Sequence, residues 1–122
     1  MKRIYEELRQ FSKEETLLIL NGDNPLEDKV GAILGAVNSI QDQPWLERLC
    51  LNYINNEEEW IAAAAINGLG DIARIFRKLD VDRVLRELNS VKQKRENLAG
   101  KIDDAIDDIK IFIKCGHSRS AI

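Results

Sequence analysis

Apolar residues recur at helical spacing in three stretches of the chain, and the three stretches share one pattern. Steps of three or four residues place each set on one face of a helix. The sets begin at Leu26, Ile61 and Leu98, so they lie 35 and then 37 residues apart. Repetition of a helical unit at this spacing predicts stacked helix pairs, in which each unit buries its apolar face against its neighbours. The full sets are Leu26, Val30, Leu34 and Val37; Ile61, Ala65, Leu69 and Ile72; and Leu98, Ile102, Ile106 and Ile109.

A second group of apolar positions repeats at the same interval. Adding 35 to four apolar positions before Ile61 gives four apolar positions before Leu98. The corresponding positions are Leu46 and Val81, Leu49 and Val84, Cys50 and Leu85, and Tyr53 and Leu88. Because both groups recur, the repeating unit is predicted to be a pair of helices. No segment alternates apolar and polar residues as a strand would, which predicts an all-α chain.

Helix start signals set the predicted boundaries. Pro25 and Pro44 stand where a helix should begin, because the missing backbone N–H costs nothing there. Ser12 opens a capping box that closes at Glu15, and Asp80 is a further N-cap candidate. We therefore predict a right-handed stack of about three helix pairs with an N-terminal lead-in helix. The predicted helices are 2–11 for the lead-in, then 13–21 with 25–40, 44–54 with 57–77, and 80–94 with 97–114.

The composition fits one domain that needs neither a disulfide nor a metal ion for stability. The chain has 122 residues, of which 44% are hydrophobic and 32% charged, and its net charge is −3. A chain of this length buries about two-thirds of its unfolded surface, which suffices for a core without disulfides or metal. We expect one domain at 1–114, a flexible tail at 115–122 and two reduced cysteines. With no apolar leader or membrane segment, a cytoplasmic location is predicted.

The second unit supports a resemblance to a repeat family. The run Ile61-Ala62-x-x-Ala65-x-x-Gly68-Leu69-Gly70-x-Ile72 resembles the inner helix of HEAT-like repeats, whose pattern is Val-Arg-x-x-Ala-x-x-Ala-Leu-Gly-x-Ile. In that pattern small residues let helices approach and aliphatic ones fill the seam. The chain departs from it where Ala62 replaces the arginine and where Asp107 stands in the third unit. The resemblance implies a HEAT-like α-solenoid.

Four aspartates in the last helix form the sharpest local feature. Asp103 with Asp107, and Asp104 with Asp108, lie four residues apart, and like charges at this spacing destabilise a helix by about 0.2–0.5 kcal/mol per pair. A chain that accepts this cost could use the patch to meet a basic partner. The alternative is a solvated face near a helix N-terminus, where carboxylates are favourable. Both interpretations stay open.

Three other groups of residues are candidate sites. Asp71 and Arg74 are candidates for a polar network at the ends of the inner helices. Trp45 and Trp60 begin helices and fit either partner anchors or core packing, of which core packing is favoured. Cys115 and His117 could form a nucleophile with a base or two metal ligands, but a mobile tail supplies neither the fixed geometry nor four ligands. No catalytic residue, metal or cofactor is predicted.

Basic residues gather around the link between the second and third pairs. Such a run could grip phosphates. Acidic residues interleave with it, which favours a salt-bridged surface over a nucleic-acid site. The basic residues are Arg74, Arg77, Lys78, Arg83, Arg86, Lys92, Lys94 and Arg95, and the acidic ones are Asp71, Asp80, Asp82 and Glu87.

These patterns favour a protein-binding module over an enzyme. In size, architecture and mild acidity the chain is similar to bacterial immunity proteins of contact-dependent inhibition and other polymorphic toxin systems. That resemblance implies stoichiometric binding of a basic toxin domain, such as a nuclease acting on tRNA, with Asp103, Asp104, Asp107 and Asp108 as first candidate contacts. Two alternatives remain, an adaptor module of a larger complex and a nucleic-acid-binding repeat.

Overall fold

The computed structural model describes residues 11–121, and every regular element among them is helical. Six α-helices and one short 3-10 helix account for most of this range, and no strand occurs in it. The all-α prediction is therefore confirmed. The helices are α2 (Lys13–Asn21), α3 (Leu26–Ser39), α4 (Gln43–Tyr53), α5 (Glu59–Phe76), α6 (Val81–Lys94), η1 (Glu96–Leu98) and α7 (Ala99–Ala121).

Side-chain caps begin the first helix of each pair. The Ser12 hydroxyl accepts a hydrogen bond from the Glu15 N–H at 3.0 Å at the start of α2. Asp42 caps α4, and Asp80 caps α6 by accepting from the Arg83 N–H at 3.4 Å. Each cap satisfies one of the backbone N–H groups that have no partner inside the helix. The predicted starts at Ser12 and Asp80 are confirmed.

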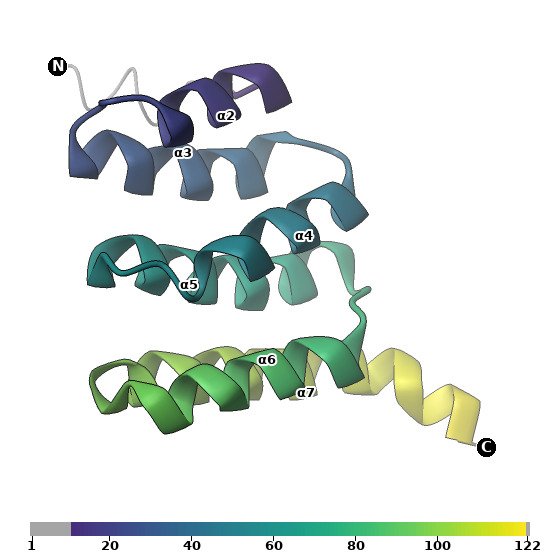
Figure 1. Ribbon diagram of the computed structural model, residues 1–122. Coiled ribbons are helices and arrows are strands. Elements are labelled where there is room, and N and C mark those ends of the chain that lie inside the picture. Colours follow the sequence, from purple (N-terminus) through teal and green to yellow (C-terminus); the bar gives the residue numbers. More distant parts are fainter. Residues whose placement is uncertain (1–10, 122) are drawn as a thin grey trace, which may run out of the picture.

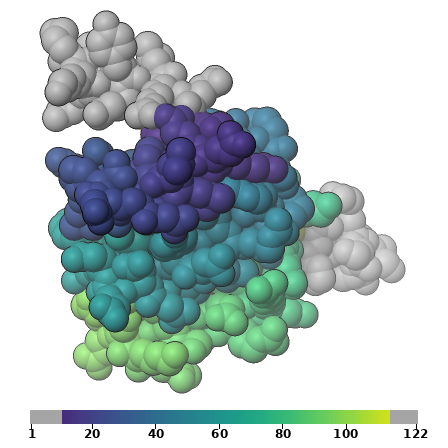
Figure 2. Space-filling view, turned by 45° about the horizontal axis from the view of Figure 1, so that its top comes forward, coloured from purple at the N-terminus to yellow at the C-terminus, as the bar shows by residue number. Residues whose placement is uncertain are grey.

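The helices form three layers, with α2 and α3 in the first, α4 and α5 in the second, and α6 and α7 in the third (Figure 1). Helices α3, α5 and α7 make a row in which α5 contacts both neighbours, and α5 also contacts α4. In the space-filling view the layers follow one another from purple to green, with side chains closing the space between them (Figure 2). Helix α5 is therefore the centre of the fold.

Small residues allow the close packing around α5. The helix buries most of its surface, including Ala62, Ala65 and Leu69, which have no exposed area. A Cβ added at Gly68 would lie 2.7 Å from Cys50 Sγ of α4, nearer than real Cβ atoms approach. At Gly70 it would lie 3.5 Å from the Cα of Ala105 in α7. The close approach expected from the small residues of the α5 pattern is found at both glycines.

Helix α5 ends at Phe76, one residue before the predicted end, because Arg77 leaves the helical conformation. Arg77 has φ 56° and ψ 33°, the left-handed region, and its N–H donates to the Ala73 carbonyl at 2.9 Å. Its guanidinium lies 5.4 Å from the centre of the Phe112 ring in α7. This cation–π contact joins the end of the second layer to the third.

The predicted end of the last helix is corrected. The sequence predicted helix to 114 and a tail at 115–122, whereas α7 continues to Ala121. Gly116 is the only strong helix breaker there, and one glycine costs about 1 kcal/mol, which does not forbid helix. The lead-in helix predicted at 2–11 lies outside the described residues except for Phe11. None of the helices within 11–121 is long and apolar enough to cross a membrane.

Candidate functional site

The exposed side of the α3–α5–α7 row is the surface where the predicted site residues gather. On α5, residues Trp60, Asn67 and Arg74 are exposed and Asp71 is half-buried, while the rest of the central turns are buried. Their spacing of seven, four and three residues puts them on one stripe of the helix. We call this stripe, together with the adjoining exposed residues of α3 and α7, the three-helix face.

Helix α7 brings two of the four predicted aspartates to this face. The Oδ2 atom of Asp108 would lie 3.1 Å from a Cβ placed on Gly70, so this half-buried carboxylate rests against α5. Asp104 is exposed one turn earlier on the same side of α7. Asp107 is exposed as well, farther round the helix. Two of the four aspartates therefore lie on the side of α7 that adjoins α5.

Asp103, unlike Asp108, lies on the side of α7 that faces α6. The ammonium of Lys92 in α6 donates a hydrogen bond to its Oδ1 atom at 2.6 Å, with 41% and 54% of the two side chains exposed. This ion pair holds Asp103 on the α6 side of α7. The sequence spacing could not reveal the separation, because helical periodicity gives the angle between side chains but not the neighbour that each one meets.

Asp71 and Arg74 form the polar pair that the sequence predicted. The Arg74 Nη2 atom donates to Asp71 Oδ1 at 3.2 Å, across one turn of α5. The side chains are 30% and 50% exposed, so the pair lies at the surface and adds little stability.

A groove opens at the end of the three-helix face where α3 and α5 begin. It has a volume of about 420 Å³ and is lined by Pro25, Leu26, Glu27, Val30 and Trp60. Trp60 is 65% exposed, so the expectation that it packs in the core is wrong. It lies on the exposed stripe of α5 with Asn67 and Arg74, whereas Ile61 and Ala62 in the same turn are buried.

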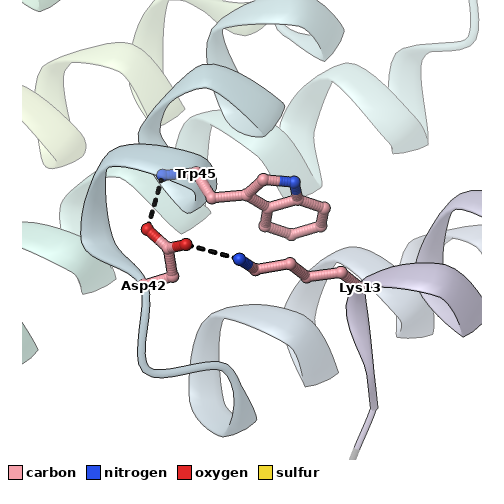
Figure 3. Close-up of polar contacts among 3 residues, drawn as sticks. All are labelled: Lys13, Asp42 and Trp45. Atoms are coloured by element: carbon pink, nitrogen blue, oxygen red, sulfur yellow. Dashed lines mark hydrogen bonds and ion pairs between the residues drawn. The ribbon is translucent and has the colours of Figure 1, made fainter.

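Trp45 does pack against the core, and Figure 3 shows how it takes part in a contact between layers. The Lys13 ammonium of α2 lies 5.7 Å from the centre of the Trp45 ring and 2.5 Å from Asp42 Oδ2. Asp42 also accepts from the Trp45 N–H at 3.2 Å. The hydrogen bond from Lys13, and then that from Trp45, lower the pKa of the Asp42 carboxyl.

Buried polar groups make the corresponding contact between the second and third layers. Gln43 donates to Glu47 Oε1 at 2.7 Å and to the Lys78 carbonyl at 2.8 Å, and the Asp80 N–H donates to the same Glu47 oxygen at 3.3 Å. Gln43 and Glu47 are buried. Sequence reasoning missed both, since long polar side chains at a helix start give no sign of burial.

Arg95 ties the turn before η1 to the turn before α5. Its guanidinium donates to the Asn56 carbonyl at 2.5 Å and to the Glu57 carbonyl at 3.4 Å. Four of the basic residues around the link, namely Arg74, Arg77, Lys92 and Arg95, thus contact groups of the same chain. The salt-bridged surface that the sequence favoured is present at Arg74 and Lys92.

The cysteines and acidic groups offer little reactive chemistry in the described part of the chain. Cys50 is fully buried, and this burial, reinforced by the charges of Asp71 and Glu47, raises the pKa of its thiol to about 12. Within that part, no three His, Cys, Asp or Glu side chains are placed to hold a metal ion. Cys115 and His117 fall outside the side chains that the structure describes.

Comparison with known proteins adds no relative. No protein-family model matches the chain, and neither the curated proteins nor the solved structures give a match.

Proposed function

We propose that this chain is a short HEAT-like α-solenoid that binds a basic protein through its three-helix face. The observation that carries the proposal is that Asp104 and Asp108 lie one turn apart on α7, with Asp108 resting against Gly70 of α5. A surface that gathers like charges lowers its own stability but attracts a partner of opposite charge. The layered helix pairs and the glycines of α5 support the HEAT-like interpretation.

The specific function that we propose is that of an immunity protein. The bound partner would be a toxin domain with a basic substrate-binding surface, such as a nuclease acting on tRNA, and binding would block that surface stoichiometrically. Complementary charge would speed association, and buried apolar contacts would set the lifetime of the complex. A cytoplasmic location follows from this role, because the protein must meet the toxin where its substrate is.

One candidate contact is revised by the contacts of the described residues. Asp103 already pairs with Lys92, so we propose Asp104, Asp107 and Asp108 as partner contacts and assign Asp103 to the third layer. Binding of nucleic acid is less favoured, because four of the eight basic residues near the link contact groups of the same chain. An adaptor role uses the same face with a different basic protein.

The test is a binding measurement with the C-terminal domain of any large secreted or surface protein encoded beside this chain. The double variant Asp104→Lys/Asp107→Lys should slow association at low salt by about tenfold or more, since charge steering contributes factors of 10–10³ to association rates. Surface plasmon resonance at several salt concentrations gives the rates. The matched control is Glu14→Lys/Asp82→Lys, which changes the net charge equally at exposed positions of α2 and α6, outside the α3–α5–α7 row.

The two double variants separate a local contact from an effect of net charge. The proposal requires that the first double variant lose both association rate and protection against toxicity, while the control keeps most of each. Equal losses would show that only net charge matters and would refute the acidic contact. A toxin domain that does not bind at micromolar concentration would refute the immunity role.

A further inference from the structure

Trp60 is the most exposed aromatic side chain in the described part of the chain. It is 65% exposed, and it stands beside Leu26, which is 36% exposed, and the half-buried Val30. Together these side chains form the apolar walls of the groove of about 420 Å³ between the starts of α3 and α5. Single exposed apolar residues are ordinary, but a contiguous apolar groove around a tryptophan is typical of a binding site.

One carboxylate lines this apolar groove, and three more precede Trp60 in the chain. Glu27 lines it, and Glu57, Glu58 and Glu59 are exposed immediately before Trp60. No ion pair within residues 11–121 involves any of these four side chains. The N-terminal ends of α3 and α5 favour negative charge, which accounts for the acids. This preference for negative charge does not account for a solvent-exposed tryptophan next to the acidic residues.

We propose that this groove, which we call the Trp60 groove, binds an extended segment of the partner in which an apolar side chain adjoins a lysine or arginine. The apolar side chain fills the space between Trp60 and Val30. The basic group reaches the carboxylate of Glu27 or the face of the indole, where a cation is attracted by the ring. Acidic segments are rejected, because they would bring like charges to the rim.

The acidic rim selects the occupant. An apolar segment without charge would gain only the contact with the groove walls, whereas a basic one also pairs with carboxylates that lack a partner. Tryptophan is among the residues most enriched where interface energy concentrates, and a pocket wall beside it excludes water from the contact. In the proposed function, the Trp60 groove is a second contact with the partner. This inference rests on the proposed function, because the groove and the acidic contacts both require a protein partner.

The experiment titrates short synthetic peptides into the isotope-labelled protein and follows the two tryptophan indole N–H signals by NMR. One peptide has a leucine between two arginines, and matched peptides carry glutamates or serines in place of the arginines. The variant Trp60→Phe assigns the signals. We expect the arginine peptide to shift the Trp60 signal saturably and to leave the Trp45 signal in place, while the glutamate peptide shifts neither.

Two variants separate the groove from general charge attraction. Trp60→Ala should weaken binding of the arginine peptide at least about 30-fold, as expected for removal of an interface anchor. Glu27→Lys keeps Trp60 and should weaken it by about fivefold or more. Because both positions are exposed, circular dichroism should show an unchanged fold.

Three results would overturn the inference: no shift of Trp60 with the arginine peptide, an equal shift with the glutamate or serine peptide, or full affinity after Trp60→Ala. The variant Asp104→Lys/Asp107→Lys keeps the groove and should bind the arginine peptide as the unmodified protein does. Loss of toxin binding by that variant together with intact peptide binding supports both proposals. Peptide binding without any toxin complex supports the groove and refutes the immunity role alone.

Discussion

The seam between α4 and α5 allows a sharp test of the packing argument through Gly68. A methyl group at this position would lie 2.7 Å from Cys50 Sγ and 3.4 Å from Val37 Cγ2. Ordinary contacts between such atoms are about 3.5–4.0 Å, so Gly68→Ala forces the sulfur or a helix to move. The same substitution favours the helix, because alanine is the better helix former. The two effects oppose each other and can be separated.

The expected free energies follow from these contacts. Overpacking a tight core costs about 1–3 kcal/mol, and the helix preference of alanine returns about 1 kcal/mol, so Gly68→Ala should lower the free energy of unfolding by about 0–2 kcal/mol. Cys50→Ala removes a buried sulfur and should lower it by about 1–2 kcal/mol. In the double variant the new methyl group occupies the space of the sulfur. Its stability should lie within about 1 kcal/mol of the unmodified protein.

Urea unfolding followed by circular dichroism measures all four proteins of this cycle. The coupling between the two substitutions should be about 1–3 kcal/mol in favour of the double variant. Gly31→Ala is the matched control, because a methyl group at that helix position meets nothing within 4 Å. It should raise stability by about 0.8–1 kcal/mol. The reasoning is refuted if the two single effects simply add, or if Gly68→Ala stabilises as much as Gly31→Ala.

Three further predictions concern the polar contacts and the buried thiol. Gln43→Leu breaks two buried hydrogen bonds and should lower the free energy of unfolding by about 2–4 kcal/mol in urea unfolding, whereas an unaffected stability would contradict the described network. Because Asp42 has a lowered pKa in the folded state, its contribution is present above the usual value of 3.8 and should be lost as pH falls below it; Asp42→Asn should flatten that part of the stability–pH curve. In a Cys115→Ser variant, the remaining Cys50 thiol, with a pKa of about 12, should react with Ellman's reagent at pH 8 only after unfolding, and fast reaction of the native protein would contradict its burial.

Local signals placed the helix starts well, because caps and helical periodicity act within a few residues. The predicted helix at 25–40 is observed as Leu26–Ser39, and that at 57–77 as Glu59–Phe76. The end of α7 was predicted too early, since Gly116 and the polar run around it resemble a tail but do not prevent helix. A cost of about 1 kcal/mol for one glycine is too small to decide the matter from sequence alone.

The candidate site was predicted only in part. The spacing of the four aspartates correctly placed Asp104 and Asp108 on one side of a helix. The spacing of Asp71 and Arg74 correctly placed these two side chains within reach of each other. The spacing could not reveal that Lys92 of α6 forms an ion pair with Asp103. Nor could it distinguish Trp45 from Trp60, since both stand near a helix start. Their difference depends on Lys13, which reaches Trp45 from the first layer, whereas Trp60 stays 65% exposed.

The sequence by itself determined the all-α class, the places where helices begin, and the faces that become buried, because these depend on period, caps and prolines near each position. The tertiary structure decided which faces meet. It set α5 between α3 and α7 with Gly70 against Ala105, placed Asp108 against α5, buried Gln43 and Glu47, and left Trp60 at the rim of a groove. These outcomes depend on contacts between residues distant in the chain, for which a helical period gives no information.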